Sequence, residues 1–420
     1  MSKRISFCAV VIAVAIAFCI SIIRSRVSAE DKHAISPNRL VVHEWGTMTS
    51  VMGEDGVAVS WRPLSDQSDL PGFVYGIGSP RRRLPTLPNS NTLNLNFNAK
   101  ADLSGTVRLE TPVVYFYANR NTTASLEVDF PRGNVTEWYP QGDRQGTSLG
   151  WKNFLISPGA ALDLPVDKVN PGSRYYAARG TDAAPVRVMG TDGLQDEKFL
   201  FYRGVGTFDL PLTVNMNDNL VTIHSRQNDA PTQAILFQNI GGSISYQVQD
   251  LVNNEIVFDR QAASKPGASL QSDLIKMLTA AGLYSKEAEA MVATWGDQWF
   301  EEGLRVFYVM PRKITDELLP LTVAPAPAEM ARVLVCRAEL ITPEVESAVL
   351  RQVVRLGDGS AEVRDSALKA LQKEGRFLEP ILNRIKNKVD DDAIKSRIDE
   401  LIAKLPVRST GVAELNRLSQ

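Results

Sequence analysis

The string VVHEWGTMTSV, residues 41–51, is rich in β-branched residues and is followed by the turn GEDG at 53–56 and a second β-type run at 57–61. Two such runs around a short glycine-containing turn predict a β-hairpin. Alternation along a strand would place His43 and Trp45 on one face and Glu44 on the other. We therefore do not expect His43 and Glu44 to act jointly on one substrate group.

Beyond this hairpin, short β-type runs separated by Gly, Pro, Asn and Asp continue to about residue 260. No helical period intervenes, which favours antiparallel sheets packed as a β-sandwich. We expect a β-rich domain over residues 40–262. Its further runs lie at 107–117, 124–130, 197–202, 210–214, 220–224, 234–238, 244–248 and 255–259.

The hydrophobic period changes at residue 263. Apolar residues recur at helical spacing in 270–281 and 288–299, with Gly282 placed to end the first helix and Trp295 and Trp299 expected in the core. Two strand-like runs follow at 304–309 and 332–340. These features predict a small mixed α/β appendage over 263–342.

Residues 343–405 are helical in pattern, with expected helices at 344–356, 361–373, 378–388 and 393–405. The pair around Gly375 resembles one HEAT-type hairpin, but a solenoid needs about three repeats to bury a continuous core. We expect an all-α, HEAT-like docking segment that could hold a protein partner, with Asp390–Asp392 as a helix cap. A flexible tail is expected at 406–420.

The N-terminus has the layout of an export signal. Lys3 and Arg4 precede an uncharged run at 5–23, and the small residues Val27 and Ala29 suit cleavage after Ala29. The run is also long enough to stay as a membrane anchor. In either case 1–29 is the signal, 30–39 a linker, and the body is extracytoplasmic.

Composition excludes several classes of protein. The 420 residues are 44% hydrophobic and 22% charged, which argues against wholesale disorder. Residues 1–29 carry four basic and no acidic residues, so the remainder has a net charge of −6 rather than −2. A mildly acidic chain of this kind is not expected to bind nucleic acid. It is also not expected to bind a membrane, except through its N-terminal segment. Cys8 and Cys19 lie in the signal, which leaves Cys336 alone.

Histidine limits the chemistry, because the chain has only His33, His43 and His224. Zinc would require His43, His224 and a carboxylate brought together by folding, so no metal and no cofactor is expected. Residues 146–150 match G-x-S-x-G around Ser148. They lack the preceding strand and following helix of a nucleophile elbow, and we read them as a turn.

Carboxylates remain the candidates for catalysis. Glu137 in TEWYP, 136–140, has aromatic neighbours that could stack a sugar and raise its pKa; Glu44 and His43 are the other catalytic candidates. Glu301 and Glu302 lie beside Trp299, so they could likewise be catalytic carboxylates, or they could be ordinary surface residues. The binding candidates are Trp138, Tyr139, Trp45 and Arg203.

Four strings together resemble a family of exported bacterial proteins: HEWGT (43–47), LETPVVYFY (109–117), TEWYP (136–140) and FYRGVG (201–206). The resemblance runs from about residue 40 to 345, and the C-terminal helices are similar to HEAT-type repeats. It implies export but no activity, so it assigns no catalytic residue. Met48 and Cys336 stand where the family would carry Phe and Gly.

Two functions fit this sequence. The first is an exported binding or scaffold protein without catalytic activity, because no catalytic constellation is assembled along the chain. The alternative is an extracytoplasmic hydrolase that cleaves glycan or peptide by carboxylate acid/base chemistry. The hydrolase requires Glu137, Glu44 and His43 to converge in one cleft.

Overall fold

The computed structural model describes residues 39–64, 70–77, 102–226, 231–262 and 264–405. The segments predicted to be an export signal (1–29), a linker (30–39, apart from residue 39) and a flexible tail (406–420) lie outside the described residues. Over the described part of the chain, no helix is both long and apolar enough to cross a bilayer.

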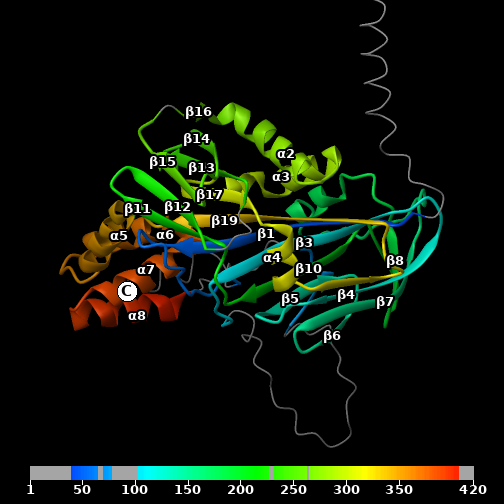
Figure 1. The fold of residues 1–420 in the computed structure, drawn as a ribbon. Helices are drawn as coiled ribbons and strands as arrows, with labels where there is room; N and C mark the ends of the chain where they lie inside the picture. Colours follow the sequence, from blue (N-terminus) through cyan, green and yellow to red (C-terminus); the bar gives the residue numbers. More distant parts are fainter. Residues whose placement is uncertain (1–38, 65–69, 78–101, 227–230, 263, 406–420) are drawn as a thin grey trace, which may run out of the picture.

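A ten-stranded sheet runs through the middle of the molecule (Figure 1). All its neighbouring strands are antiparallel except β1 and β19, which are parallel. In spatial order the strands are β16 (Lys265–Pro266), β14 (Ser243–Asp250), β13 (Gln233–Ile240), β17 (Gly303–Val309), β19 (Glu329–Leu340), β1 (Val41–Met52), β3 (Val107–Tyr117), β10 (Leu200–Gly206), β5 (Gly133–Tyr139) and β2 (Tyr75–Gly76).

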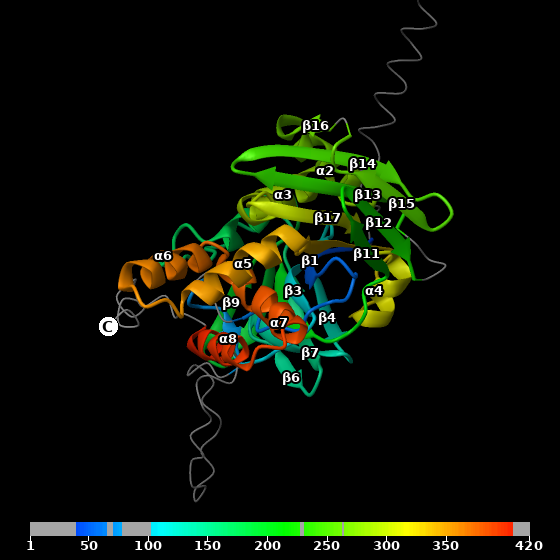
Figure 2. The same cartoon turned by 90° about the vertical axis from the view of Figure 1, so that its left-hand side faces the viewer.

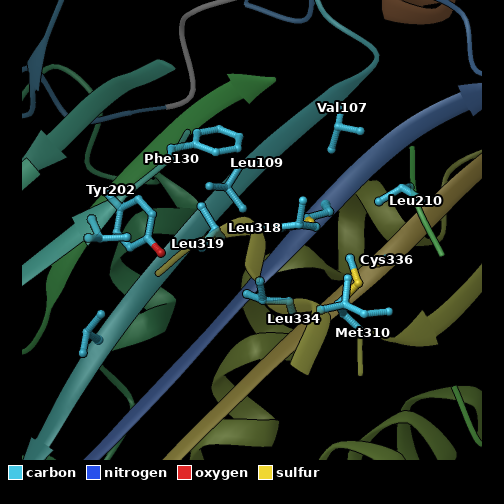
Figure 3. Packing of buried hydrophobic residues seen from close by; sticks show 14 of the residues in the cluster. Val107, Leu109, Phe130, Tyr202, Leu210, Met310, Leu318, Leu319, Leu334 and Cys336 are labelled. Carbon is cyan, nitrogen blue, oxygen red and sulfur yellow. The ribbon is translucent and has the colours of Figure 1, made fainter. Parts of the chain in front are cut away.

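Two smaller sheets share one apolar core with the ten-stranded sheet. The six-stranded sheet holds β18 (Leu321–Ala324), β4 (Thr122–Asp129), β7 (Ser148–Ile156), β8 (Val186–Gly190) and β9 (Gly193–Glu197), with β6 (Asp143–Gln145) paired to β7. The three-stranded sheet holds β11 (Leu212–Asn217), β12 (Leu220–Ser225) and β15 (Glu255–Asp259). Figure 3 shows Leu109, Phe130, Leu210 and Leu334 from these layers packed together, with α4 (Arg312–Leu318) closing the core. The mainly β architecture expected from the sequence is confirmed.

Helices cover the opposite face of the ten-stranded sheet. The 3₁₀ helices η2 (Arg174–Arg179) and η3 (Gly267–Ser269) accompany α2 (Leu270–Ala280) and α3 (Ser285–Trp299). In α2, Leu270, Leu274 and Leu278 are buried because they repeat every four residues, and Gly282 follows the helix at a φ of 114°. Trp295 and Trp299 are buried in this second core, as predicted.

The segment 263–342 is not an appendage, and this expectation was wrong. Its strands β17 and β19 lie in the centre of the ten-stranded sheet, and β19 pairs with β1 from Val41↔Glu329 to Met52↔Leu340. The hydrophobic pattern predicted both strands correctly. It could not show their partner, because strand pairing depends on contacts almost 300 residues apart in sequence.

The C-terminal helices form a third core at one end of the strands (Figure 2). They are α5 (Pro343–Arg355), α6 (Ala361–Gln372), η4 (Gly375–Phe377), α7 (Leu378–Lys388) and α8 (Asp392–Lys404), close to the predicted ranges. Thr342 caps α5, and Asp391 caps α8 as expected. Their apolar faces pack on Val51 at the end of β1 and on Trp61.

Candidate functional site

A row of buried polar and charged side chains crosses six neighbouring strands on the helix-covered face of the ten-stranded sheet. Each of these strands places its alternate residues in the apolar core on the other face, so the charged residues point together toward the helices. None of the strand residues is more than 5% exposed. We call this row the arginine band; it comprises Thr47, Thr49, Arg108, Glu110, Glu137, Arg203, Arg305, Arg337 and Glu339, with Glu301 and Arg376 from the covering segments.

A chain of ion pairs joins one end of the arginine band to the C-terminal helices. Arg305 Nε lies 2.9 Å from Glu339 Oε1, which also accepts from Arg337 Nε. Arg337 Nη2 then lies 2.5 Å from Glu301 Oε1, and Arg376 Nη2 lies 2.6 Å from the same oxygen. Because Arg376 belongs to η4, the helical segment supplies part of the band.

Glu110 lies at the electrostatic centre of the band. Burial by itself raises the pKa of this carboxyl, yet the pKa is lowered because four guanidinium groups surround it: those of Arg108, Arg376, Arg337 and Arg203. Arg108 Nε is 3.9 Å from Glu110 Oε1. The carboxylate is therefore held ionised, and the other charges create a positive potential at its position.

Several buried polar atoms of the band have no hydrogen-bond partner in the described part of the chain. They include the hydroxyls of Thr47 and Thr49, Glu110 Oε1 and Arg376 Nε. Leaving a buried polar atom unsatisfied costs about 1–3 kcal/mol, so such atoms normally bond to water or to a ligand. We therefore treat the band as a candidate polar binding site.

Three candidates predicted from the sequence, Glu137, Arg203 and Glu301, lie in this band. Glu137 on β5 and Arg203 on β10 are register partners, and Glu137 Oε1 lies 4.0 Å from Arg203 Nη1. The hydroxyl of Thr136 donates to the other carboxylate oxygen of Glu137. Glu301 also belongs to the band, through its contacts with Arg337 and Arg376.

Glu44 and Trp138 point to the other face, into the core between the sheets. Glu44 accepts from Tyr202 Oη at 2.5 Å and from Arg332 Nε at 2.5 Å. The Trp138 ring is stacked on Tyr75 with 6.5 Å between centroids. Both residues are thus part of packed core structure.

His43 lies on the helix-covered face but is bonded to α3. Its Nδ1 is 2.8 Å from Glu287 Oε2, and Tyr117 donates to Glu287 Oε1 at 2.8 Å. Trp45 and Tyr139 are buried in the same aromatic core. His43, Glu44 and Glu137 therefore occupy three separate buried environments, and the convergence that the hydrolase hypothesis requires is not formed.

Glu110, Arg337 and Arg376 were not among the residues predicted from the sequence. A signal was present, because Arg108-x-Glu110 and Arg337-x-Glu339 share one spacing inside otherwise apolar strands. Charges two residues apart lie on the same face of a strand, and a charge in a buried strand needs a specific partner. Arg376 carried no comparable signal, because it lies in a short helical turn.

The described residues contain no group of three or more His, Cys, Asp and Glu side chains placed to hold a metal ion. His224 lies on β12 in the three-stranded sheet, away from His43 on β1, with its Nδ1 3.1 Å from Glu255. A separate groove of about 660 Å³ lies between residues 55–62 and α7.

No protein-family model and no curated protein sequence matches this chain. Among solved structures, it is similar to the Fcho1 μ-homology domain of Danio rerio with a bound Eps15 peptide, at 7% identity and a TM-score of 0.26 over 74% of this chain and 100% of that chain. It is also similar to the yeast δ-COP-I μ-homology domain complexed with a Dsl1 WxWxV peptide, at 8% identity and a TM-score of 0.30 over 73% of this chain and 99% of that chain. These scores are too low to establish a shared fold.

Proposed function

We propose that this chain is an extracytoplasmic binding protein whose ligand lies against the arginine band. The observation that carries the proposal is Glu110, a fully buried carboxylate kept ionised by arginines from four segments of the chain. The unpartnered hydroxyls of Thr47 and Thr49 lie on the neighbouring strand, where Thr47 is the register partner of Glu110. Export of the chain by residues 1–29, cleaved or retained as an anchor, is part of this proposal.

The ligand we propose is an oxygen-rich, acidic glycan. Guanidinium groups recognise carboxylates with paired hydrogen bonds, and threonine hydroxyls suit sugar hydroxyls. Glu110 and Glu137 add acceptors for further sugar hydroxyls. A purely apolar ligand would leave the buried hydroxyls of Thr47 and Thr49 unsatisfied.

The C-terminal helices take part in the proposed site through Arg376. Its guanidinium also lies over the Phe377 ring at 4.8 Å, and Arg337 lies over the same ring at 5.7 Å. The contacts of η4 with the band would then change when the ligand binds. We propose that this HEAT-like segment transmits occupancy of the band to a protein partner.

Calorimetry with the full chain tests the glycan site. The probes are a trimer of galacturonic acid and its neutral methyl ester. We expect binding of the acid only, and about tenfold to hundredfold weaker binding in Thr47→Val/Thr49→Val, which loses two hydrogen bonds at nearly constant volume. Thr123→Val, an exposed substitution on β4, is the matched control and should bind normally. Equal affinity of the wild type and the double variant would reject the site.

The groove beside α7 favours a second function, docking of a protein partner. It is lined by Trp61 and Arg62 on one side and by Asn383, Arg384 and Asn387 on the other. We expect Asn387→Trp, which fills the groove, to abolish co-purification of the partner with the full chain from the cell envelope. The control Glu400→Trp on the exposed part of α8 should retain it. Retention of the same partner by both variants would count against this docking site.

A further inference from the structure

A second cavity lies apart from the α7 groove, and none of the residues of the arginine band lines it. Its volume is about 390 Å³, within the size range of small-ligand sites. Most of its lining consists of alanine, proline and glycine from residues 158–161 and 181–185. The polar side chains that line it are Tyr117, Thr181, Asp182 and Lys198.

Lys198 is the one cationic side chain among the residues that line this cavity. It is half-buried, and its ammonium makes no hydrogen bond or ion pair with any described residue. The nearby carboxylate of Asp182 is already engaged, since Lys286 Nζ lies 2.6 Å from its Oδ1. The cavity wall thus presents a partly desolvated positive charge without a bonded counter-charge.

The protonation behaviour of Lys198 agrees with this arrangement. Burial is the main cause that lowers the pKa of its amine, and the charge of Lys286 lowers the pKa further, while Asp182 and Glu197 act in the opposite direction. A bound anion would favour the charged ammonium and so oppose these effects. The small apolar side chains around it would accept a short aliphatic body.

We propose that this cavity binds a small aliphatic monocarboxylate, with the Lys198 ammonium as the partner of the carboxylate. A single cation matches a single negative charge, and a multiply charged ligand would meet Asp182. The alanine and proline side chains of the walls offer contact to methylene groups. This site shares no residue with the arginine band, so an experiment that rejects one of the two proposed sites leaves the other untouched.

Butyrate and its neutral analogue butyramide are the probes. With the full chain, we expect butyrate at ten times its calorimetric dissociation constant to slow acylation of Lys198 about tenfold, as read by peptide mass spectrometry. Acylation of the exposed Lys152 is the internal control and should not change. Butyramide should protect neither lysine.

Two variants extend the test. Lys198→Gln should abolish butyrate binding, and Asp182→Asn should strengthen it because a nearby negative charge is removed. Protection of Lys198 by butyramide, or no protection by butyrate beyond that of Lys152, would overturn the proposal. Because the protection experiment uses the wild type, it decides the question even if a variant fails to fold.

Discussion

Arg332 on β19 donates from Nε to Glu44 Oε2 on β1 at 2.5 Å, and both side chains are only 1% exposed. The two residues are register partners in the parallel pair at the centre of the ten-stranded sheet. Tyr202 from β10 and Asp316 from α4 complete the network. One buried ion pair thus joins strands from opposite ends of the chain.

We expect Glu44→Ala to destabilise the fold by about 3–5 kcal/mol, because the substitution leaves most of the Arg332 charge buried without its main partner. The paired change Glu44→Leu/Arg332→Met should recover most of that loss. Chemical denaturation of each variant gives the free energies of unfolding. A single variant as stable as the wild type would show that Arg332 is compensated elsewhere.

Met48 and Cys336 are also register partners on β1 and β19, and both are fully buried in the core between the sheets. Met48→Phe alone should cost about 1–3 kcal/mol through overpacking. Cys336→Gly alone should also destabilise, by creating a cavity and by loosening a strand interior. In the double variant, the ring introduced at position 48 lies next to the space left by the removed side chain of Cys336. We therefore expect a favourable coupling of about 0.5–3 kcal/mol between the two substitutions. Strict additivity of the two losses would contradict this account.

Glu301 makes the stability of the sheet contact with η4 dependent on pH. Burial opposes ionisation, but Arg376 and Arg337 lower the pKa of Glu301 below its ordinary value of 4.5. Its contribution is therefore complete above about pH 4.5 and is lost as the pH falls through the lower native pKa. We expect Glu301→Gln to cost about 1.5–3 kcal/mol at pH 6.

This prediction is checked by measuring the free energy of unfolding of the wild type and of Glu301→Gln at a series of pH values from 6 downward. The difference between the wild type and Glu301→Gln should shrink as the pH falls. The exposed Glu289→Gln on α3 is the control and should show no such trend. If the difference in free energy of unfolding between the wild type and Glu301→Gln grew as the pH fell, the prediction would be wrong.

Burial raises the pKa of the Cys336 thiol to about 12. Since the thiolate is the reactive form, the native chain should resist iodoacetamide at pH 8 at this position. Peptide mass spectrometry should find Cys336 unmodified in the native protein and fully modified after denaturation in urea. Rapid native modification would mean that β19 opens locally.

The sequence predicted the local elements well and their assembly poorly. Helix α2 followed from the four-residue repeat of Leu270, Leu274 and Leu278, and α3 from the apolar stripe that ends in Trp295 and Trp299; both are local properties. The boundary at residue 263 followed a real change of period but marks no structural division, because β17 and β19 complete the same sheet as β1. Local patterns indicate which face of a strand is apolar, and they do not identify its neighbour.

The same limit applies to the candidate site. The alternation of His43 and Glu44 was predicted correctly, and it already argued against joint action. The charge pairs in β3 and β19 were a local signal, but the band as a whole could not be predicted because its members come from six strands, η4 and the turn at Glu301, and only the folded chain brings these together. Glu137 and Arg203 were singled out for their neighbours in sequence, although their place in the band depends on the pairing of β5 with β10.

The pairing of β1 with β19 has a consequence for biosynthesis. β1 leaves the ribosome early, but one of its two neighbours is complete only at residue 340. Until then, a strand that is buried along its entire length has an unpaired edge, which is prone to intermolecular association. Fragments that end before Leu340 should therefore aggregate, and the nascent chain should depend on chaperones until β19 has been made.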